Sequence, residues 1–172
     1  MPAVNSFSPV LTSDAKILIL GSMPGKRSLD DNQYYAHPRN VFWPIFFTLF
    51  NIDIDSLEGV DKYQQKLACL KIESVALWDV LHSCSRESSL DADIVESSIV
   101  VNDFSKLFFE YETIKHIYFN GAKAEQLYKR YVIPTLSDQH KSLSMTRLPS
   151  TSPAYAAMSF EKKLQEWAAI IR

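Results

Sequence analysis

The sequence has few cysteines and no long apolar run, and each shortage excludes a class of protein. Its two cysteines, Cys69 and Cys84, belong to no CxxC pair and to no cluster with histidine, so we expect buried free thiols and neither a disulfide nor a metal site. No apolar run approaches the roughly 20 residues that a membrane-spanning helix needs, and the N-terminus has no basic segment followed by an apolar one. We therefore expect a cytoplasmic protein that does not associate with membranes.

An excess of basic residues is also missing. The formal net charge is −2 at pH 7, which counts against nucleic-acid binding, because such proteins usually carry a basic patch or a high pI. Local positive potential is still available, since Lys26, Arg27 and Arg39 lie close together in the sequence. These side chains can hold a few phosphates.

The overall composition is that of one globular domain. The chain has 172 residues, of which 47% are hydrophobic and 22% are charged, so it is long enough for one substantial core and is neither a disordered nor a membrane protein. It contains no internal repeat, no linker and no low-complexity tract. We expect residues 1–172 to form a single domain that acts as a monomer.

A short apolar run followed by a glycine-containing loop is the most informative segment. Residues 17–20 (ILIL) predict a strand buried on both faces, and the following GSMPG predicts a tight loop with exposed backbone. In an open α/β sheet, ligands bind at the carboxyl ends of the strands. The loop spacing matches neither GxGxxG nor the phosphate-binding GxxxxGK pattern, so a dinucleotide or ATP site is not favoured. Candidate binding residues in the loop are Gly21, Ser22, Met23, Pro24 and Gly25.

Strand and helix patterns alternate along the chain. Strands are predicted at residues 15–20, 74–78, 113–119 and 142–148. This alternation predicts a three-layer α/β/α sandwich around a central four-stranded parallel sheet. Helices are predicted at residues 122–131 and where apolar residues recur at helical spacing, namely Phe42, Ile45, Phe46 and Leu49; Leu57, Val60, Leu67 and Leu70; Ile94, Val101, Phe104, Phe108 and Tyr111; and Phe160, Leu164, Trp167 and Ile171 after a Ser159 cap.

The remaining segments lack a clear period. We expect residues 1–13 to be a lead-in across the sheet edge, and residues 26–37 and 82–90 to be surface loops. Residues 33–44 differ from an ordinary loop because aromatic side chains surround hydrogen-bonding ones. This mixture favours a pocket for a flat polar ligand such as a nucleobase. The aromatic members are Tyr34, Tyr35, Phe42 and Trp43, and the polar members are His37, Arg39 and Asn40.

Four blocks together resemble a known family. GSMPG, YYAHPRNVFW, YFNG and LPSTSPA follow one another in this order, and the chain is most similar to the DNA-deoxyinosine (hypoxanthine-DNA) glycosylases of the uracil-DNA glycosylase superfamily. The resemblance implies a monofunctional DNA glycosylase of base excision repair with a uracil-DNA-glycosylase-like fold and no cofactor. Its partner would be DNA containing deaminated bases, with hypoxanthine as the first substrate and uracil or xanthine next. Iron–sulfur members need four cysteine ligands, so we expect no cluster here.

The resemblance also assigns roles to residues. Tyr35 would stack on the base, Asn120 would read its edge, and Gly21, Ser22 and Met23 would line its site. In many relatives an Asp or Asn in the first loop positions the attacking water, but the matching residue here is Met23, so we expect Asn40 to be the catalytic residue. Many relatives also have His or Asn where this chain has Leu148. The expected DNA contacts are Pro24, Gly25, Arg39, Ser150, Thr151 and Ser152.

Structural roles are also open for several of these residues. From spacing alone, Asn40 is a helix N-cap, Tyr35 a core residue and Asn120 part of an asparagine–glycine turn. His37 is interpreted as a structural hydrogen-bonding residue. Asp79 is either a site residue or the cap of a following helix.

Two other functions are compatible with the same blocks. The AHPRNVFW segment also resembles mismatch-specific uracil or thymine glycosylases. The apolar Met23 and Leu148 would suit a non-catalytic protein that binds damaged DNA.

Overall fold

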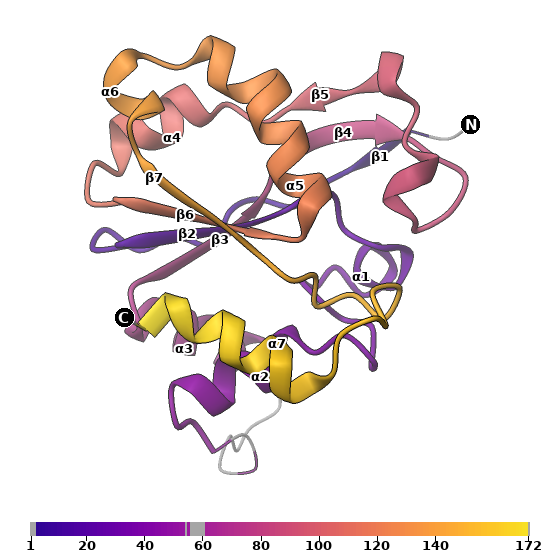
Figure 1. The fold of residues 1–172 in the computed structure, drawn as a ribbon, viewed down its shortest axis with the longest axis vertical. Coiled ribbons are helices and arrows are strands. Elements are labelled where there is room, and N and C mark those ends of the chain that lie inside the picture. The colour runs from indigo at the N-terminus through magenta and orange to yellow at the C-terminus, as the bar shows by residue number, and fades with distance from the viewer. Residues whose placement is uncertain (1–2, 54, 56–60, 172) are drawn as a thin grey trace.

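The computed structural model describes residues 3–53, 55 and 61–171, and a parallel sheet forms its centre (Figure 1). The sheet has four strands in the order β3-β2-β6-β7, and every pairing is parallel. The predicted fold class is therefore confirmed, although each strand begins one to three residues later than its apolar pattern indicated. The strands are β2 (Ile17–Gly21), β3 (Val75–Asp79), β6 (His116–Asn120) and β7 (Ser144–Leu148).

Each central strand contributes to two cores, because successive side chains point to opposite faces of a sheet. In β2, Leu18 and Leu20 belong to one cluster of buried side chains, whereas Ile19 belongs to the other. All five residues of β3 are buried. This two-sided burial explains why the strands appear in the sequence as continuous apolar runs.

Helices cover both faces of the sheet (Figure 1). On one face lie α2 (Phe42–Leu49), α3 (Lys62–Ile72) and α7 (Phe160–Trp167), and on the other lie α4 (Phe104–Glu110), α5 (Ala122–Leu127) and α6 (Asp138–Lys141). Leu57 and Val60, which the sequence placed on the second helix, lie outside the described residues. Within the described part of the chain, none of the helices has the length and apolar character needed to cross a bilayer.

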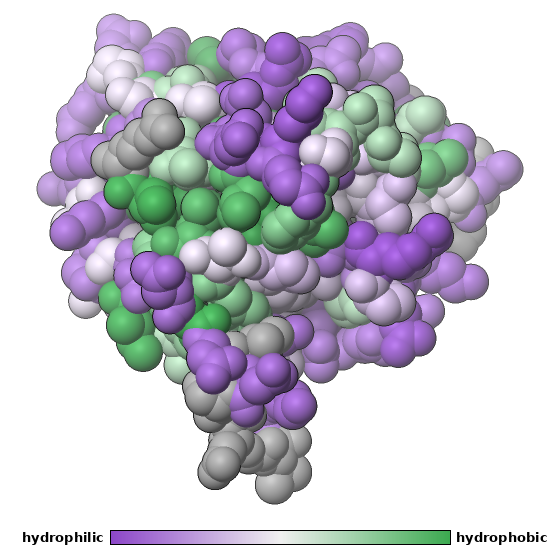
Figure 2. All heavy atoms as spheres, turned by 60° about the horizontal axis from the view of Figure 1, so that its bottom comes forward, coloured by the Kyte–Doolittle hydropathy of each residue, from purple (hydrophilic) through white to green (hydrophobic). Residues whose placement is uncertain are grey.

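The face that carries α2, α3 and α7 keeps some apolar side chains at the surface. Figure 2 looks onto this side of the molecule and shows an apolar area there. Large exposed apolar residues at the ends of these helices include Ile72 at the end of α3 and Ile171 after α7. Of the residues predicted to form the buried face of the last helix, Trp167 is buried but Ile171 is exposed. The chain tightens into a 3₁₀ turn over Ala168–Ile171, and this turn buries Ile170 instead.

A second, smaller sheet corrects two predictions. β1 (Ala3–Asn5), β4 (Leu81–Ser85) and β5 (Val100–Val101) form it with antiparallel pairings. The predicted loop 82–90 therefore begins as a strand, since the chain continues from β3 with Leu81 and Cys84 buried. The predicted helix over residues 94–111 shrinks to α4, because the Asp103 side chain accepts the backbone N–H of Lys106 and caps the helix there.

The other irregular segments are also more ordered than predicted. Residues 26–37 contain a short helix, α1 (Lys26–Asp31), which ends at Asn32 in a left-handed conformation. The lead-in crosses the sheet edge as expected, since Val10 pairs antiparallel with Leu77 of β3.

Both cysteines, Cys69 and Cys84, are buried free thiols, as the sequence predicted.

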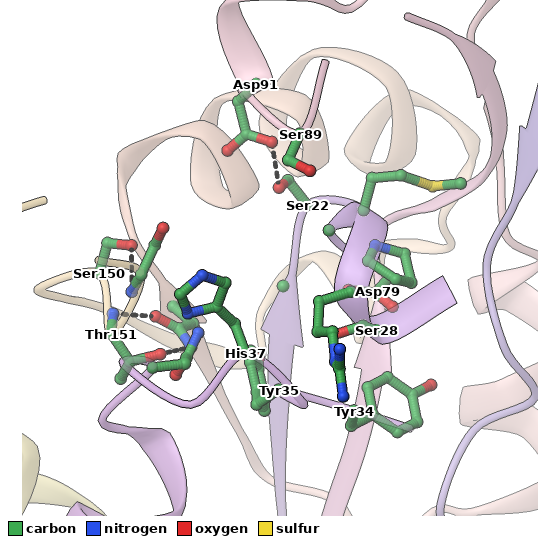
Figure 3. A pocket seen from close by; sticks show the side chains of 18 of the residues that line it. Ser22, Ser28, Tyr34, Tyr35, His37, Asp79, Ser89, Asp91, Ser150 and Thr151 are labelled. Atoms are coloured by element: carbon green, nitrogen blue, oxygen red, sulfur yellow. Dashed lines mark hydrogen bonds between the residues drawn. The ribbon is translucent and has the colours of Figure 1, made fainter. Parts of the chain in front are cut away.

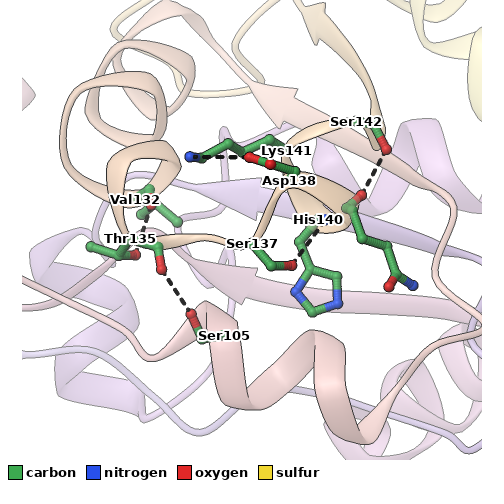
Figure 4. A network of polar contacts seen from close by, with 9 residues as sticks. Ser105, Val132, Thr135, Ser137, Asp138, His140, Lys141 and Ser142 are labelled. Atoms are coloured by element: carbon green, nitrogen blue, oxygen red, sulfur yellow. Dashed lines mark hydrogen bonds and ion pairs between the residues drawn. The ribbon is translucent and has the colours of Figure 1, made fainter.

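The connection from α5 to β7 is fixed by polar contacts (Figure 4). After α5 the chain forms a π-helical turn (Tyr128–Val132) and a 3₁₀ turn (Ile133–Thr135). The Ser105 hydroxyl donates to the Thr135 carbonyl at 3.3 Å, and the Ser137 side chain accepts the His140 N–H and caps α6. These contacts hold the chain that leads into β7.

Gly121, between β6 and α5, gives a test of this local geometry. Its φ is +96°, and an added Cβ would lie 3.0 Å from the Cβ of Ser150. We expect Gly121→Ala to lower the free energy of unfolding by about 1–3 kcal/mol. Gly25→Ala is the matched control, because φ at Gly25 is −67° and its nearest neighbour would lie 3.9 Å away. Urea unfolding measures the free energy of unfolding of both variants. Equal losses in the two variants would contradict the view that the positive φ and the close contact with Ser150 require glycine at position 121.

Candidate active site

The four sequence blocks meet at one cavity beyond the carboxyl ends of the strands. Its volume is about 170 Å³, and Figure 3 shows the surrounding side chains. Arg39 is exposed and does not line it. Every other predicted site residue does, namely Gly21, Ser22, Met23, Pro24, Gly25, Tyr35, Asn40, Asn120, Ser150, Thr151 and Ser152.

Gly21 brings the first loop into direct contact with two polar side chains. A Cβ at this position would lie 2.5 Å from Oδ1 of Asp79 and 3.3 Å from the hydroxyl of Tyr35. The first distance is shorter than any tolerated contact, so a side chain cannot be placed here without displacing Asp79. The absence of a side chain therefore allows the backbone, the carboxyl group and the phenol to share one wall of the cavity.

The loop is held from behind by the segment that follows β3. The N–H groups of Val80 and Leu81 donate to the carbonyls of Gly21 and Ser22, at 2.8 and 3.1 Å. The Ser22 hydroxyl donates to Oδ1 of Asp91 at 2.7 Å. The buried Arg86 guanidinium donates to the Pro24 carbonyl. These bonds fix the loop before any ligand binds.

Tyr35 is held in a strained conformation against the helix that follows. Its φ is +54°, a value that a non-glycine residue adopts at a cost, often at functional sites. Its ring stacks on Phe42 with centroids 4.2 Å apart. Its buried hydroxyl has no hydrogen-bond partner among the described residues. Burial and the nearby Asp79 raise the pKa of this hydroxyl, against a smaller opposing effect of Asn120, so it stays protonated.

Asn40 combines a structural contact with access to the cavity. Its Oδ1 accepts the N–H of Phe42, the first residue of α2, at 2.9 Å. The capping interpretation is therefore partly correct, although the residue at the helix cap itself is Val41. The structure shows no hydrogen bond from the Asn40 side-chain nitrogen to the described residues, and this residue lines the cavity. The amide N–H groups of Asn40 are free to meet a ligand.

His37 supports the same turn. Its Nδ1 accepts the backbone N–H of Arg39 at 3.1 Å, and its carbonyl accepts the N–H of Asn40 at 2.8 Å. A neutral imidazole in this arrangement carries its proton on Nε2. His37 is thus a structural hydrogen-bonding residue, as interpreted from the sequence, that also lines the cavity.

Asn120 joins the third and fourth blocks. Its Oδ1 accepts the backbone N–H of Thr151, and its Nδ2 donates to the Thr151 hydroxyl, both at 2.9 Å (Figure 3). A primary amide has two N–H bonds, so Thr151 uses only one N–H of Asn120, and the Tyr35 hydroxyl lies close to the same amide. Thr151 itself is 1% exposed, which makes it a support for Asn120.

Asp79 is the site residue that the sequence left unresolved. It ends β3, lines the cavity and is 3% exposed, and its Oδ2 has no hydrogen-bond partner among the described residues. A strand, β4, follows it, so the capping alternative is wrong. Burial, reinforced by the negative charge of Asp91 and opposed by Arg86, raises the pKa of Asp79 from 3.8 to about 7. The sequence did contain one indication that Asp79 belongs to the site: like Asn120, it directly follows the apolar residues of a predicted strand.

Residues 9–172 match the family model described as the uracil DNA glycosylase superfamily. The chain belongs to the uracil DNA glycosylase superfamily. Within it, the chain is 38% identical over 118 residues to a hypoxanthine DNA glycosylase of Methanosarcina barkeri, covering 69% of this chain and 71% of the relative. It is 34% identical over 149 residues to a hypoxanthine DNA glycosylase of Methanosarcina acetivorans, covering 82% and 90%.

A solved structure of this superfamily has the same fold. It is a solution NMR structure of a Methanosarcina acetivorans protein described as a candidate uracil DNA glycosylase. The TM-score is 0.79 at 33% identity, with 99% of this chain and 98% of that chain covered. The likeness therefore includes all four loops around the cavity.

The buried Asp79 carboxyl predicts a pH-dependent stability. The unfolded chain ionises this group near its ordinary pKa of 3.8, whereas the folded protein does so only near 7. The native fold therefore loses stability as the pH rises between these values. We expect Asp79→Asn to be more stable than the native protein at pH 8, by on the order of 3 kcal/mol, and nearly equal to it at pH 4. Denaturant unfolding at both pH values tests this, and a difference that does not change with pH would contradict it.

Proposed function

We propose that this superfamily member is a monofunctional DNA glycosylase that hydrolyses the N-glycosidic bond of deaminated bases, with hypoxanthine as its first substrate. The observation that carries the proposal is the single cavity onto which all four blocks converge, in a chain whose named relatives are hypoxanthine DNA glycosylases. Residues 1–172 would act as one domain on DNA. Uracil and xanthine are proposed as further substrates.

The size of the cavity supports a purine as ligand. A cavity needs about 10–15 Å³ of free volume for each water molecule, so the 170 Å³ here has room for on the order of ten waters. Hypoxanthine has about ten non-hydrogen atoms and is therefore of matching size. A base inside duplex DNA cannot reach a recessed site while it is stacked. The enzyme would therefore rotate the nucleotide out of the helix before cleavage.

Three groups would hold the extruded base. The ring of Tyr35, backed by Phe42, offers a stacking surface, and its strained backbone fixes its position. The remaining N–H of Asn120 would donate to the base edge. The first loop would contribute its backbone, since the Met23 side chain is 6% exposed and packs in the hydrophobic core.

Asn40 would act on the reaction itself. Breaking the glycosidic bond builds positive character on the sugar and negative charge on the departing base. A neutral amide cannot serve as a general base near pH 7, so Asn40 would orient the attacking water or stabilise the departing base by hydrogen bonding. Its Oδ1 bond to Phe42 fixes the amide and directs the free N–H groups.

The rim of the cavity would hold the DNA backbone. Pro24, Gly25, Ser150 and Ser152 lie at its wall, and the exposed Arg39 would contact phosphate beside it. Thr151 would position Asn120 instead of contacting DNA, because its hydroxyl already accepts a hydrogen bond from the Asn120 amide.

A panel of lesion-containing duplexes tests the proposed activity. We expect release of hypoxanthine, leaving an intact abasic site that alkali then cleaves. Lys26 also lines the cavity, so borohydride trapping checks the monofunctional assignment, and we expect no covalent complex. Selective retention of damaged DNA without product, even with enzyme in excess, would instead show a non-catalytic binder.

Asn40→Ala tests the catalytic assignment. We expect single-turnover cleavage to fall about 100-fold or more, the usual effect of losing one such donor, and the free energy of unfolding to fall by only about 1 kcal/mol. Asp103→Ala, which removes the cap of α4 on the other face of the sheet, is the matched stability control and should remain active. Near-native turnover of Asn40→Ala would refute the assignment.

Asn40→Asp then separates the two roles proposed for this residue. The carboxylate keeps an oxygen for the Phe42 N–H but has no N–H to donate. If Asn40 orients water, Asn40→Asp should retain more activity than Asn40→Ala. If Asn40 stabilises the departing base, the added negative charge should make Asn40→Asp the slower variant.

A further inference from the structure

Asp79 is a buried acidic side chain at the wall of the cavity, and its carboxyl group has no part in the reaction as proposed so far. Its Oδ1 and the Tyr35 hydroxyl both lie within 3.3 Å of the point that a Cβ of Gly21 would occupy. Neither Oδ2 of Asp79 nor the Tyr35 hydroxyl has a hydrogen-bond partner among the described residues. Buried polar atoms are rarely left unpaired, so this pair indicates a place that a ligand completes.

The position of Asp79 relative to Tyr35 indicates which part of the ligand it meets. A base stacked on the Tyr35 ring has its polar edge at the perimeter of that ring. Asp79 lies beside the hydroxyl end of the same ring and borders the cavity. The carboxyl group is therefore placed at the edge of a stacked base.

The surroundings of Asp79 favour its neutral form. Burial is the largest influence on its pKa, which rises to about 7, and Asp91 adds to the rise while Arg86 opposes it. Asp91 itself is engaged by the Ser22 hydroxyl. The titratable or charged groups that interact electrostatically with Asp79 are Tyr34 and Tyr35 before α2, Tyr63 in α3, and Arg86 and Asp91 after β4.

We propose that Asp79 is a catalytic residue that protonates the departing purine at N7. The inference rests on the proposed function and names the leaving-group chemistry of the same site. As the bond between C1′ and N9 breaks, its electron pair moves into the purine, N7 takes the proton from the Asp79 carboxyl, and hypoxanthine leaves neutral. Water adds to C1′ and releases one proton, which restores the carboxyl group.

This role distinguishes purines from pyrimidines. Hypoxanthine presents N7 as an acceptor on its five-membered ring, whereas uracil has no such atom. A carboxyl group held in its neutral form is a donor. It would accelerate purine release without helping uracil in the same way.

The test is a pH profile of single-turnover hypoxanthine release from duplex DNA between pH 5.5 and 9. The native rate should fall as the pH rises through the pKa of Asp79. Asp79→Asn, which has nearly the same shape but no acidic proton, should be about 100-fold slower at pH 6 and nearly independent of pH. Asp138→Asn is the matched control, because Asp138 lies on the exposed α6, far from the cavity lining, and its carboxylate pairs with Lys141 at 3.8 Å. It should reproduce the native profile.

Each outcome decides the question. A native rate near pH 6 in Asp79→Asn, or a slower variant that keeps the native pH profile, would overturn the inference. So would a flat native profile, a result that requires no variant to fold. If the native protein releases no hypoxanthine at any pH, the proposed function fails and the inference falls with it.

Discussion

The contact of Gly21 with Asp79 and Tyr35 is the constraint on which the cavity depends. The parallel register pairs Gly21 with Asp79 at the ends of neighbouring strands, and a Cβ at Gly21 would lie 2.5 Å from the carboxyl oxygen. Because no side chain fits there, a backbone loop, a buried acid and a phenol share one wall. Burial of this acid is expected to cost the fold stability as the pH rises from 3.8 to about 7, as is common where function competes with stability.

The rest of the site is built to keep that wall in place. Segment 80–91 holds the first loop through backbone bonds, Asp91 and Arg86. On the opposite side, Asn120 and Thr151 join two loops by reciprocal hydrogen bonds. Tyr35, His37 and Asn40 come from the segment between α1 and α2. Stacking of Tyr35 on Phe42 and the hydrogen bond from the Phe42 N–H to Asn40 fix this segment to α2. Such rigidity suits a catalyst that works by position and electrostatics.

The sequence predicted the sheet better than its surroundings, for a physical reason. Strands buried on both faces produce apolar runs, so β2 and β3 were found within one or two residues. β4 has exposed and partly exposed serine and histidine positions, and β5 has two residues, so neither leaves a periodic signal. Within the site, the residue pattern indicated the glycine-containing loop and the aromatic segment 33–44, whereas the roles of the individual residues came from the family resemblance. Burial of Asp79 and pairing of Asn120 with Thr151 depend on strand register, which one sequence does not reveal.

The central claim is that one deaminated purine, rotated out of DNA, occupies this cavity. The most direct test is a crystal structure of the protein with a duplex that contains a 2′-fluorinated deoxyinosine analogue resistant to cleavage. The account predicts the base in the cavity, stacked on Tyr35, with Asn40 at its glycosidic bond and Asp79 at N7. A base that remains stacked in the duplex, or that binds outside the cavity, would contradict it.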